Sequence, residues 1–311
     1  MDVSEMSKEH KRRYIWAIGG GKGGIGKSVI AANLSIALSE RGKEVIAVDG
    51  DLGGANLHNL FGIIYPPKTL DDFIRKEVTD IRDVLIDTEI PHLKLISGAL
   101  DIVNMSNPKY MLQQRVIRHI RSLEADYVIL DLGAGMSYPV LDFFLISEQG
   151  IFVVTPEPTS LENAYRFLRG VFFRKLRKLA NQDEVKKIIE LAMDRGNPQG
   201  IRTPFDLLER VEETDSQTGI FLKEQIRQFR PQLIVNQVRD HKQGQLGFSV
   251  QSVCRKYFGI ELDYLGFVSY DHNVYLSVQK RSPFIVTYPA SEAARCIRDI
   301  ASHLLDGKRR D

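Results

Sequence analysis

The sequence predicts an α/β fold built on a doubly wound, mostly parallel sheet of about seven to eight strands flanked by helices. Short apolar runs alternate with helix-length segments, as in a parallel sheet with crossover helices. Most runs are continuously apolar, which is typical of strands covered on both faces. With 311 residues, 43% of them hydrophobic, the chain can bury a large core. The predicted strands are Tyr14–Ile18, Val45–Val48, Leu93–Ile96, Tyr127–Leu130, Ile151–Val154, Leu233–Val235 and Leu262–Val268.

Composition and charge exclude several classes of protein. The formal net charge of +2 does not support sequence-independent nucleic-acid binding, although such binding stays possible. Cys254 and Cys296 are too far apart for a CxxC metal site and do not form a disulfide framework. No apolar stretch reaches the length needed to span a bilayer. We therefore expect a cytoplasmic protein.

The predicted organisation is a single domain between two polar tails. Residues 1–13 carry nothing to bury and are expected to form a flexible basic tail, and residues 307–311 a short polar one. Residues 14–306 form the expected domain. Within it, residues 160–230 exceed what one crossover helix needs and predict a helical insertion. The first helix of this insertion opens with Thr159–Glu162, whose residue types fit a capping box.

A glycine-rich loop follows the first predicted strand and opens a helix. The stretch Gly21–Ser28 matches G-x-x-x-x-G-K-[ST], in which backbone N–H groups wrap a phosphate chain at a helix N-terminus. We expect Lys27 to bring positive charge to the β- and γ-phosphates, and the Ser28 hydroxyl to bind Mg²⁺. The residues predicted to bind the nucleotide here are Gly21, Lys22, Gly23, Gly24, Ile25, Gly26, Lys27, Ser28 and Val29.

A second lysine, Lys22, stands at the front of the same loop. Two cations in one loop repel each other unless an anion compensates them. Because Lys22 precedes the inner curve of the loop, its side chain can point outward, towards the nucleotide of a neighbouring subunit. There it would stabilise charge during phosphoryl transfer, as an arginine finger does. The alternative is a solvated surface lysine.

Acidic residues follow two of the predicted strands. Asp49 and Asp51 come after the strand at 45–48, and Asp131 comes after the strand at 127–130. In a parallel sheet these positions share the edge that carries the phosphate loop. Carboxylates there can hold Mg²⁺, mostly through water, and can orient a nucleophilic water against the γ-phosphate. A single strand-end aspartate more often caps a loop, so it is the group of three that favours a site.

Asn236 ends the strand that begins at Leu233. A side-chain amide can donate to and accept from the N6/N7 edge of adenine, which makes Asn236 a candidate for base binding. The alternative is an asparagine that caps the following turn.

Four stretches resemble the MinD/ParA family of P-loop ATPases. Residues 18–28, IGGGKGGIGKS, followed by VIAANL, resemble the family's deviant Walker A motif. Residues 49–57, DGDLGGANL, and residues 131–135, DLGAG, resemble its switch I and switch II. Residues 266–271, GFVSYD, resemble its nucleotide loop, with Ser269 where the family usually has proline. The resemblance covers nearly the whole chain after residue 13, apart from the helical insertion.

The resemblance implies ATP and Mg²⁺ as cofactors and an ATP-dependent homodimer in which a lysine of each subunit reaches the partner's phosphates. One aspartate would polarise the attacking water. The implied roles are catalytic for Lys22, Lys27 and Asp51, metal-binding for Ser28, Asp49 and Asp131, dimer-forming for Lys22, Asn56 and Glu157, and base-binding for Asn236 and Asp271.

We therefore expect an ATPase that acts as a slow dimerisation switch and regulates the position or number of a cellular structure. The stretch DGDLGGANL favours the FlhG-like members, which regulate flagellar number. One alternative is an ATP-dependent biosynthetic enzyme resembling dethiobiotin synthetase or cobyrinate amidase, against which Lys22 argues. Another is an adaptor that binds ATP and barely hydrolyses it.

Two helical segments bear on partners. The helix at 160–180 mixes apolar residues with cations, which fits either a core-packed helix with a solvated basic face or a docking surface for a protein partner or anionic lipid. The last periodic segment, Ser291–Leu305, has the apolar stripe of a core-docked helix, and residues 306–311 offer nothing to insert into lipid. Direct membrane anchoring by this route is not favoured, so any recruitment to a cell pole or membrane would go through a partner.

Overall fold

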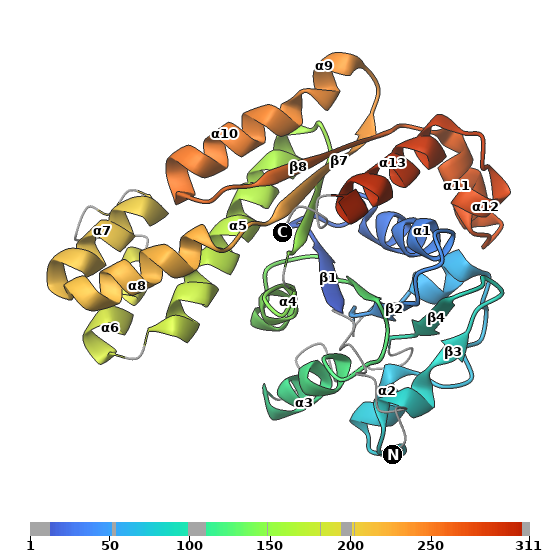
Figure 1. Cartoon of the computed structure of the whole chain (residues 1–311), viewed down its shortest axis with the longest axis horizontal. Coiled ribbons are helices and arrows are strands. Elements are labelled where there is room, and N and C mark those ends of the chain that lie inside the picture. The colour runs from blue at the N-terminus through green and yellow to red at the C-terminus, as the bar shows by residue number, and fades with distance from the viewer. Residues whose placement is uncertain are drawn as a thin grey trace, which may run out of the picture.

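The computed structural model describes residues 13–51, 54–98, 110–147, 149–180, 182–193, 201 and 203–306. Both expected tails therefore lie outside the described residues, apart from Arg13. Within this part of the chain, the strands form one sheet in the order β3-β4-β2-β5-β1-β6-β7-β8 (Figure 1). All neighbours are parallel except β3 and β4. The predicted doubly wound, mostly parallel sheet is confirmed.

Seven of the strands follow the predicted runs. The two-residue strand β3 lies antiparallel at the edge of the sheet and was not predicted, because two residues are too short to show a pattern. The strands are β1 (Tyr14–Gly19), β2 (Val45–Asp49), β3 (Ile86–Asp87), β4 (Leu93–Ile96), β5 (Tyr127–Asp131), β6 (Ile151–Val154), β7 (Gln232–Val238) and β8 (Asp263–Ser269).

Helices cover both faces of the sheet (Figure 1). The α-helices are α1 (Lys27–Ser39), α2 (Leu70–Ile74), α3 (Tyr110–Ile120), α4 (Tyr138–Phe144), α5 (Pro158–Leu179), α6 (Asp183–Met193), α7 (Pro204–Thr214), α8 (Ser216–Arg227), α9 (His241–Gly244), α10 (Leu246–Phe258), α11 (His272–Gln279), α12 (Phe284–Thr287) and α13 (Glu292–Asp306). Two 3₁₀ helices, η1 (Leu57–Phe61) and η2 (Ile81–Val84), complete the described elements.

The central strand β1 divides the interior into two cores. Ile15 and Ala17 belong to a core shared with α4, α5 and α10, whereas Trp16 and Ile18 belong to a core shared with α1 and α13. Successive side chains of a strand point to opposite faces, so a continuously apolar strand fills both cores. This buries β1 from Ile15 to Gly19 and fixes the position of the loop that follows it.

In the chain, helices α5 to α8 follow β6 and precede β7, and they extend to the left of Figure 1. These four α-helices lie in the stretch predicted as a helical insertion, whereas the predicted capping box at Thr159–Glu162 is wrong. Helix α5 begins at Pro158 behind Glu157, which makes no side-chain cap. The Ser160 hydroxyl accepts a hydrogen bond from the Thr155 N–H at 2.9 Å instead. Proline at the first helical position starts the helix earlier than the capping pattern predicted.

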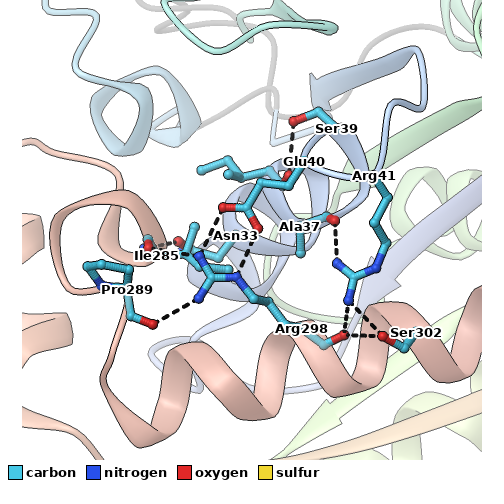
Figure 2. A network of polar contacts seen from close by, with 10 residues as sticks. Asn33, Ala37, Ser39, Glu40, Arg41, Ile285, Pro289, Arg298 and Ser302 are labelled. Carbon is cyan, nitrogen blue, oxygen red and sulfur yellow. Dashed lines mark hydrogen bonds and ion pairs between the residues drawn. The ribbon is translucent and has the colours of Figure 1, made fainter.

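Polar contacts join the helix after the glycine-rich loop, α1, to the last helix, α13 (Figure 2). The Arg298 guanidinium contacts both carboxylate oxygens of Glu40, at 2.8 and 2.9 Å. In the other direction, Arg41 donates to the Arg298 carbonyl at 2.8 Å and to the Ser302 hydroxyl at 2.6 Å. Glu40 and Arg41 directly follow α1, so these contacts hold its C-terminal end against α13.

The C-terminal helix α13 is docked on the core, as its stripe predicted. The residues of this stripe are buried: Ala294, Ile297, Ile300, Ala301 and Leu304. Among the described residues, no helix is both long enough and apolar enough to cross a membrane.

Candidate functional site

The glycine-rich loop joins β1 to α1 at the carboxyl edge of the sheet. Gly24 and Gly26 adopt positive φ angles of 77° and 89°, which L-residues rarely adopt. A Cβ on Gly21 would lie 2.2 Å from the carbonyl oxygen of Asn163, so only glycine fits there. The first turn of α1 holds no acidic residue, so its positive end stays available to an anion.

Lys27 lies inside the curve of this loop. Its residue surface is 7% exposed, and its Nζ donates to the Lys22 carbonyl at 3.2 Å. Burial lowers the pKa of Lys27, while the nearby carboxylates of Asp131 and Asp51 act in the opposite direction. The ammonium group thus lies between the phosphate loop and the acidic strand ends.

The Lys22 side chain lies on the other side of the loop. Its Nζ donates to Glu157 Oε2 at 2.9 Å and to Thr159 Oγ1 at 3.2 Å, both at the start of α5 in the same chain. The pair is exposed, with 37% of the Lys22 side chain and 59% of the Glu157 side chain accessible. The two lysines of the loop therefore point to different surroundings, one to the loop interior and one to its rim. The crossing of Lys22 to a partner stays a prediction.

Asp49 and Asp131 end the neighbouring strands β2 and β5, where they pair in register. They are only 1% and 2% exposed. The carboxylate of Asp49 accepts from the backbone N–H of Asp51 at 3.1 Å and of Leu57 at 3.0 Å. Asp131 Oδ1 is buried, and none of the described residues hydrogen-bonds to it. The second strand-end carboxylate is thus less well satisfied than the first.

Electrostatics set these two carboxylates apart from surface aspartates. Burial raises the pKa of Asp49, and the backbone N–H donors oppose the increase. Burial also raises the pKa of Asp131, and the neighbouring Asp49 carboxylate adds to it, whereas the Ser28 hydroxyl and Lys27 oppose it. Two neighbouring carboxyl groups that are shielded from water repel each other when both are charged, so they favour binding a cation or a proton.

The donor set fits Mg²⁺. Ser28 and Asp131 hydrogen-bond to each other, and Asp49 is the register partner of Asp131, so three hard oxygen donors lie in the same part of the site. The unpartnered Asp131 Oδ1 is the feature that a cation, with its water, would satisfy. Within the described residues, no group of three histidine, cysteine or acidic side chains is arranged to hold a metal. Mg²⁺ binds one or two carboxylates and completes its shell with water and phosphate oxygens, which the two carboxylates and the Ser28 hydroxyl would allow.

Asp51 lies where the segments after β2 and β5 meet. A Cβ on Gly133 would lie 2.9 Å from the Asp51 Cγ, so the glycine leaves just enough room for this carboxylate. Gly135, two residues further, has a φ of 100°. The predicted switch segments are therefore in contact. Asn56, the other predicted residue of the first segment, is exposed and donates to the Gly54 carbonyl at 2.7 Å.

A pocket of about 490 Å³ opens beside the glycine-rich loop, on the side of β7 and β8. Its lining includes the predicted base-binding residues Asn236 and Asp271, together with Val29. Asn236 Nδ2 donates to the Ile25 carbonyl of the loop at 2.8 Å. Asp271 caps α11 by accepting from the Asn273 N–H at 2.8 Å. Both candidates line the pocket, and the side chain of each also makes a structural hydrogen bond, one to the glycine-rich loop and one to the start of α11.

The strand end predicted at Asn236 is wrong, because β7 continues to Val238. Sequence reasoning also missed several residues of the pocket. The clustering of aromatic side chains around Asp271 could have indicated three of them, whereas no pattern in the sequence indicates Gln237. The missed residues are Gln237, Tyr270, His272 and Tyr275.

Comparison with known proteins decides the family. The model of the CobQ/CobB/MinD/ParA nucleotide-binding domain matches residues 16–284. The chain belongs to this family. Among its relatives, the antiactivator FleN of Pseudomonas aeruginosa is 27% identical over 96% of this chain and 88% of its own length. The septum site-determining protein MinD of Helicobacter pylori is 32% identical over 58% of this chain and 65% of its own.

Solved structures of CobQ/CobB/MinD/ParA-like proteins share the fold. MinD of Pyrococcus horikoshii, complexed with Mg-ADP, superposes with a TM-score of 0.64 at 22% identity, over 96% of this chain and 99% of that one. A ParA family ATPase of Chlorobium tepidum gives a TM-score of 0.63 at 19% identity, over 94% and 99%. At these identities the likeness concerns the fold, and the roles of individual residues in this chain rest on its own geometry.

Proposed function

We propose that the protein is an ATP-driven dimerisation switch of the MinD/ParA type. ATP and Mg²⁺ bind at the carboxyl edge of the sheet, two subunits close on each other across this edge, and slow hydrolysis reopens them. The observation that carries the proposal is the opposite placement of the two loop lysines. Lys27 is buried inside the loop, whereas Lys22 lies at its rim beside Glu157, ready to exchange a weak surface contact for a partner's phosphates.

Each predicted residue has a role that its position supports. The backbone N–H groups of residues 21–29 hold the phosphate chain, and Lys27 neutralises its β/γ oxygens. Ser28, Asp49 and Asp131 would hold Mg²⁺, which neutralises charge that develops on the phosphates. Asp51 orients the water that attacks the γ-phosphate, because it lies beside Gly133 at the junction of the two switch segments.

The biological role proposed is regulation of the position or number of a cellular structure. It is supported by similarity to the antiactivator FleN over nearly the whole of both chains and to the flagellum site-determining protein YlxH of Helicobacter pylori over 49% of this chain. The family also spans CobQ and CobB, so membership alone leaves the biosynthetic alternative open. Lys22 at the loop rim argues for the switch.

The partner surface is proposed on the closed-dimer face or on α5. Several cations of α5 pair within the chain, for example Arg166 with Glu162 and Arg177 with Glu190. This supports the reading of α5 as a packed helix with a solvated face and leaves the dimer face, with Asn56 and Glu157, as the stronger candidate. Recruitment to a pole or membrane would then depend on a partner.

The decisive experiment compares Lys22→Ala with Asp51→Ala by light scattering after size exclusion and by phosphate release. We expect Asp51→Ala to dimerise with ATP without turnover, and Lys22→Ala to bind ATP without dimerising or hydrolysing it. Lys94→Ala is the matched control, because Lys94 also forms an exposed ion pair, with Asp87 at 2.5 Å.

The alternatives give different outcomes. Full turnover by a monomeric Lys22→Ala variant would defeat the switch and favour an enzyme that acts on a separate substrate. Normal dimerisation of the wild type with ATP, without any phosphate release, would favour the adaptor.

A further inference from the structure

One residue inside β7 has a backbone conformation that non-glycine residues rarely adopt. Four non-glycine residues among those described have positive φ angles: Lys76, His92, Gln237 and Arg281. Lys76 and Arg281 follow the ends of α2 and α11, and His92 lies in the turn before β4. Gln237, at φ 59°, is the one that lies within a strand. Such strain persists where the surrounding structure imposes it, and it clusters at functional sites.

A bulge in the pairing of β7 with β8 produces this conformation. Val235 pairs with Phe267 and Val238 pairs with Ser269, so two residues of β7 stand opposite Val268 alone. In antiparallel pairs, one common type of bulge places glycine at the left-handed position, because glycine has no Cβ to clash. The β7–β8 pair is parallel, and the same steric argument favours glycine at its left-handed position. The chain has glutamine there. A glutamine where glycine would be less strained indicates that its side chain has a use.

The bulge brings consecutive residues to one pocket. Neighbouring side chains of a regular strand point to opposite faces of the sheet. Yet Asn236 and Gln237 both line the pocket beside the glycine-rich loop. The amide of Asn236 supports the loop through the Ile25 carbonyl. The half-buried side-chain amide of Gln237 has no hydrogen-bond partner among the described residues, so its donor and acceptor both remain available.

We propose that Gln237 is the residue that selects adenine over guanine in this pocket. The inference rests on the proposed function, since it assumes that the pocket holds the base of a nucleotide whose phosphates lie in the loop. An amide presents one donor and one acceptor, which match N7 and the N6 amino group of adenine. Guanine presents two acceptors, O6 and N7, on the same edge, so the amide oxygen would face an acceptor.

The test measures binding of ATP and of GTP by calorimetry in the presence of Mg²⁺. We expect the wild type to prefer ATP, and Gln237→Ala to lose about tenfold of that preference. Gln237→Arg should shift the preference towards GTP, because arginine donates to both O6 and N7 of guanine. Gln228→Ala, which removes an exposed glutamine that follows α8, serves as the matched control and should keep the wild-type ratio.

Gln237→Gly separates recognition from backbone strain. Glycine adopts the left-handed conformation without clash, so this variant should melt at a higher temperature than the wild type while losing the same preference as Gln237→Ala. An unchanged ATP-to-GTP ratio in both variants would overturn the inference alone, with the proposed function intact. If the wild type bound neither triphosphate, the proposed function and the inference would fall together.

Discussion

Two buried aspartates differ in what surrounds them. Asp142, on α4, is 0% exposed, and its carboxylate accepts two hydrogen bonds from Arg174 at 2.7 Å and one ion pair from Lys178 at 2.7 Å. Asp131, at the end of β5, is 2% exposed, and its Oδ1 has no hydrogen-bond partner in the part of the chain that the structure describes. Both residues have almost no solvent-exposed surface, and only the Asp142 carboxylate is paired with cations of its own chain on both oxygens.

The pKa values follow this difference. Burial by itself raises the pKa of Asp142, but the hydrogen bonds from Arg174 and Lys178 outweigh it and lower the pKa. Burial raises the pKa of Asp131, and the opposing contacts do not compensate. A buried charge whose oxygen atoms are all paired within the chain has a structural role, which here is to hold α4 against α5. A buried charge that lacks such partners indicates that something else completes it.

Removing the charge of Asp142 should have the largest effect on stability. In Asp142→Asn, two cations packed against α4 lose their carboxylate, and breaking a buried ion pair costs about 3–5 kcal/mol. The free energy of unfolding, measured by urea denaturation, should therefore fall by about 3 kcal/mol or more. Nucleotide affinity of the variant that remains folded should be unchanged.

Asp87→Asn is the control for this substitution. Asp87 pairs with Lys94 at the surface, where the pair contributes less than about 1 kcal/mol. Equal losses in Asp142→Asn and Asp87→Asn would contradict the assignment of Asp142 to the architecture.

The same substitution at Asp131 should act on turnover instead. Asp131→Asn removes a proposed Mg²⁺ ligand, so phosphate release in the presence of ATP should fall about 100-fold. Without nucleotide, the melting temperature should stay the same or rise, because burial disfavours the carboxylate that is removed. A loss of stability as large as that of Asp142→Asn would show that Asp131 is structural, and the contrast between the two would disappear.

The sequence could predict the phosphate end of the site because its information is local. The eight residues from Gly21 to Ser28 determine a loop, a helix start and a cation together, and the continuous apolar runs place Asp49 and Asp131 at one edge. The contact of Asp142 with Arg174 joins residues 32 positions apart, and no short sequence pattern predicts it.

The base end of the site depended on tertiary structure. The bulge at Gln237 follows from how β7 meets β8, and an apolar run shows neither the bulge nor the two residues by which β7 extends past Asn236. The helix start at Pro158 was misplaced for a related reason. Ser160 is used by the Thr155 N–H, a contact that only the packed loop reveals.

Acid should remove the contribution of Asp142 and so sharpen the contrast. Its pKa is lowered in the folded state, so the stabilisation is present above the unfolded value, about 3.9, and is lost as the pH falls through the folded value. The difference in unfolding free energy between the wild type and Asp142→Asn should be constant above about pH 5 and shrink towards pH 2. A difference that is the same at both ends would mean that the charge of Asp142 is not what stabilises the α4–α5 contact.

The smallest effect on folding should come from the ion pair at the rim of the loop. Glu157 is largely exposed, so Glu157→Gln should change the free energy of unfolding by less than about 1 kcal/mol. The substitution should instead affect ATP-dependent dimerisation. It removes the carboxylate charge that pairs with Lys22 in the single subunit, and it changes the surface that the partner subunit would contact. The measurement is the ATP concentration at which half of the protein dimerises, with Asp87→Asn as the control. An unaltered midpoint would remove Glu157 from the dimer seam and leave Lys22 and Asn56 as the predicted dimer-forming residues.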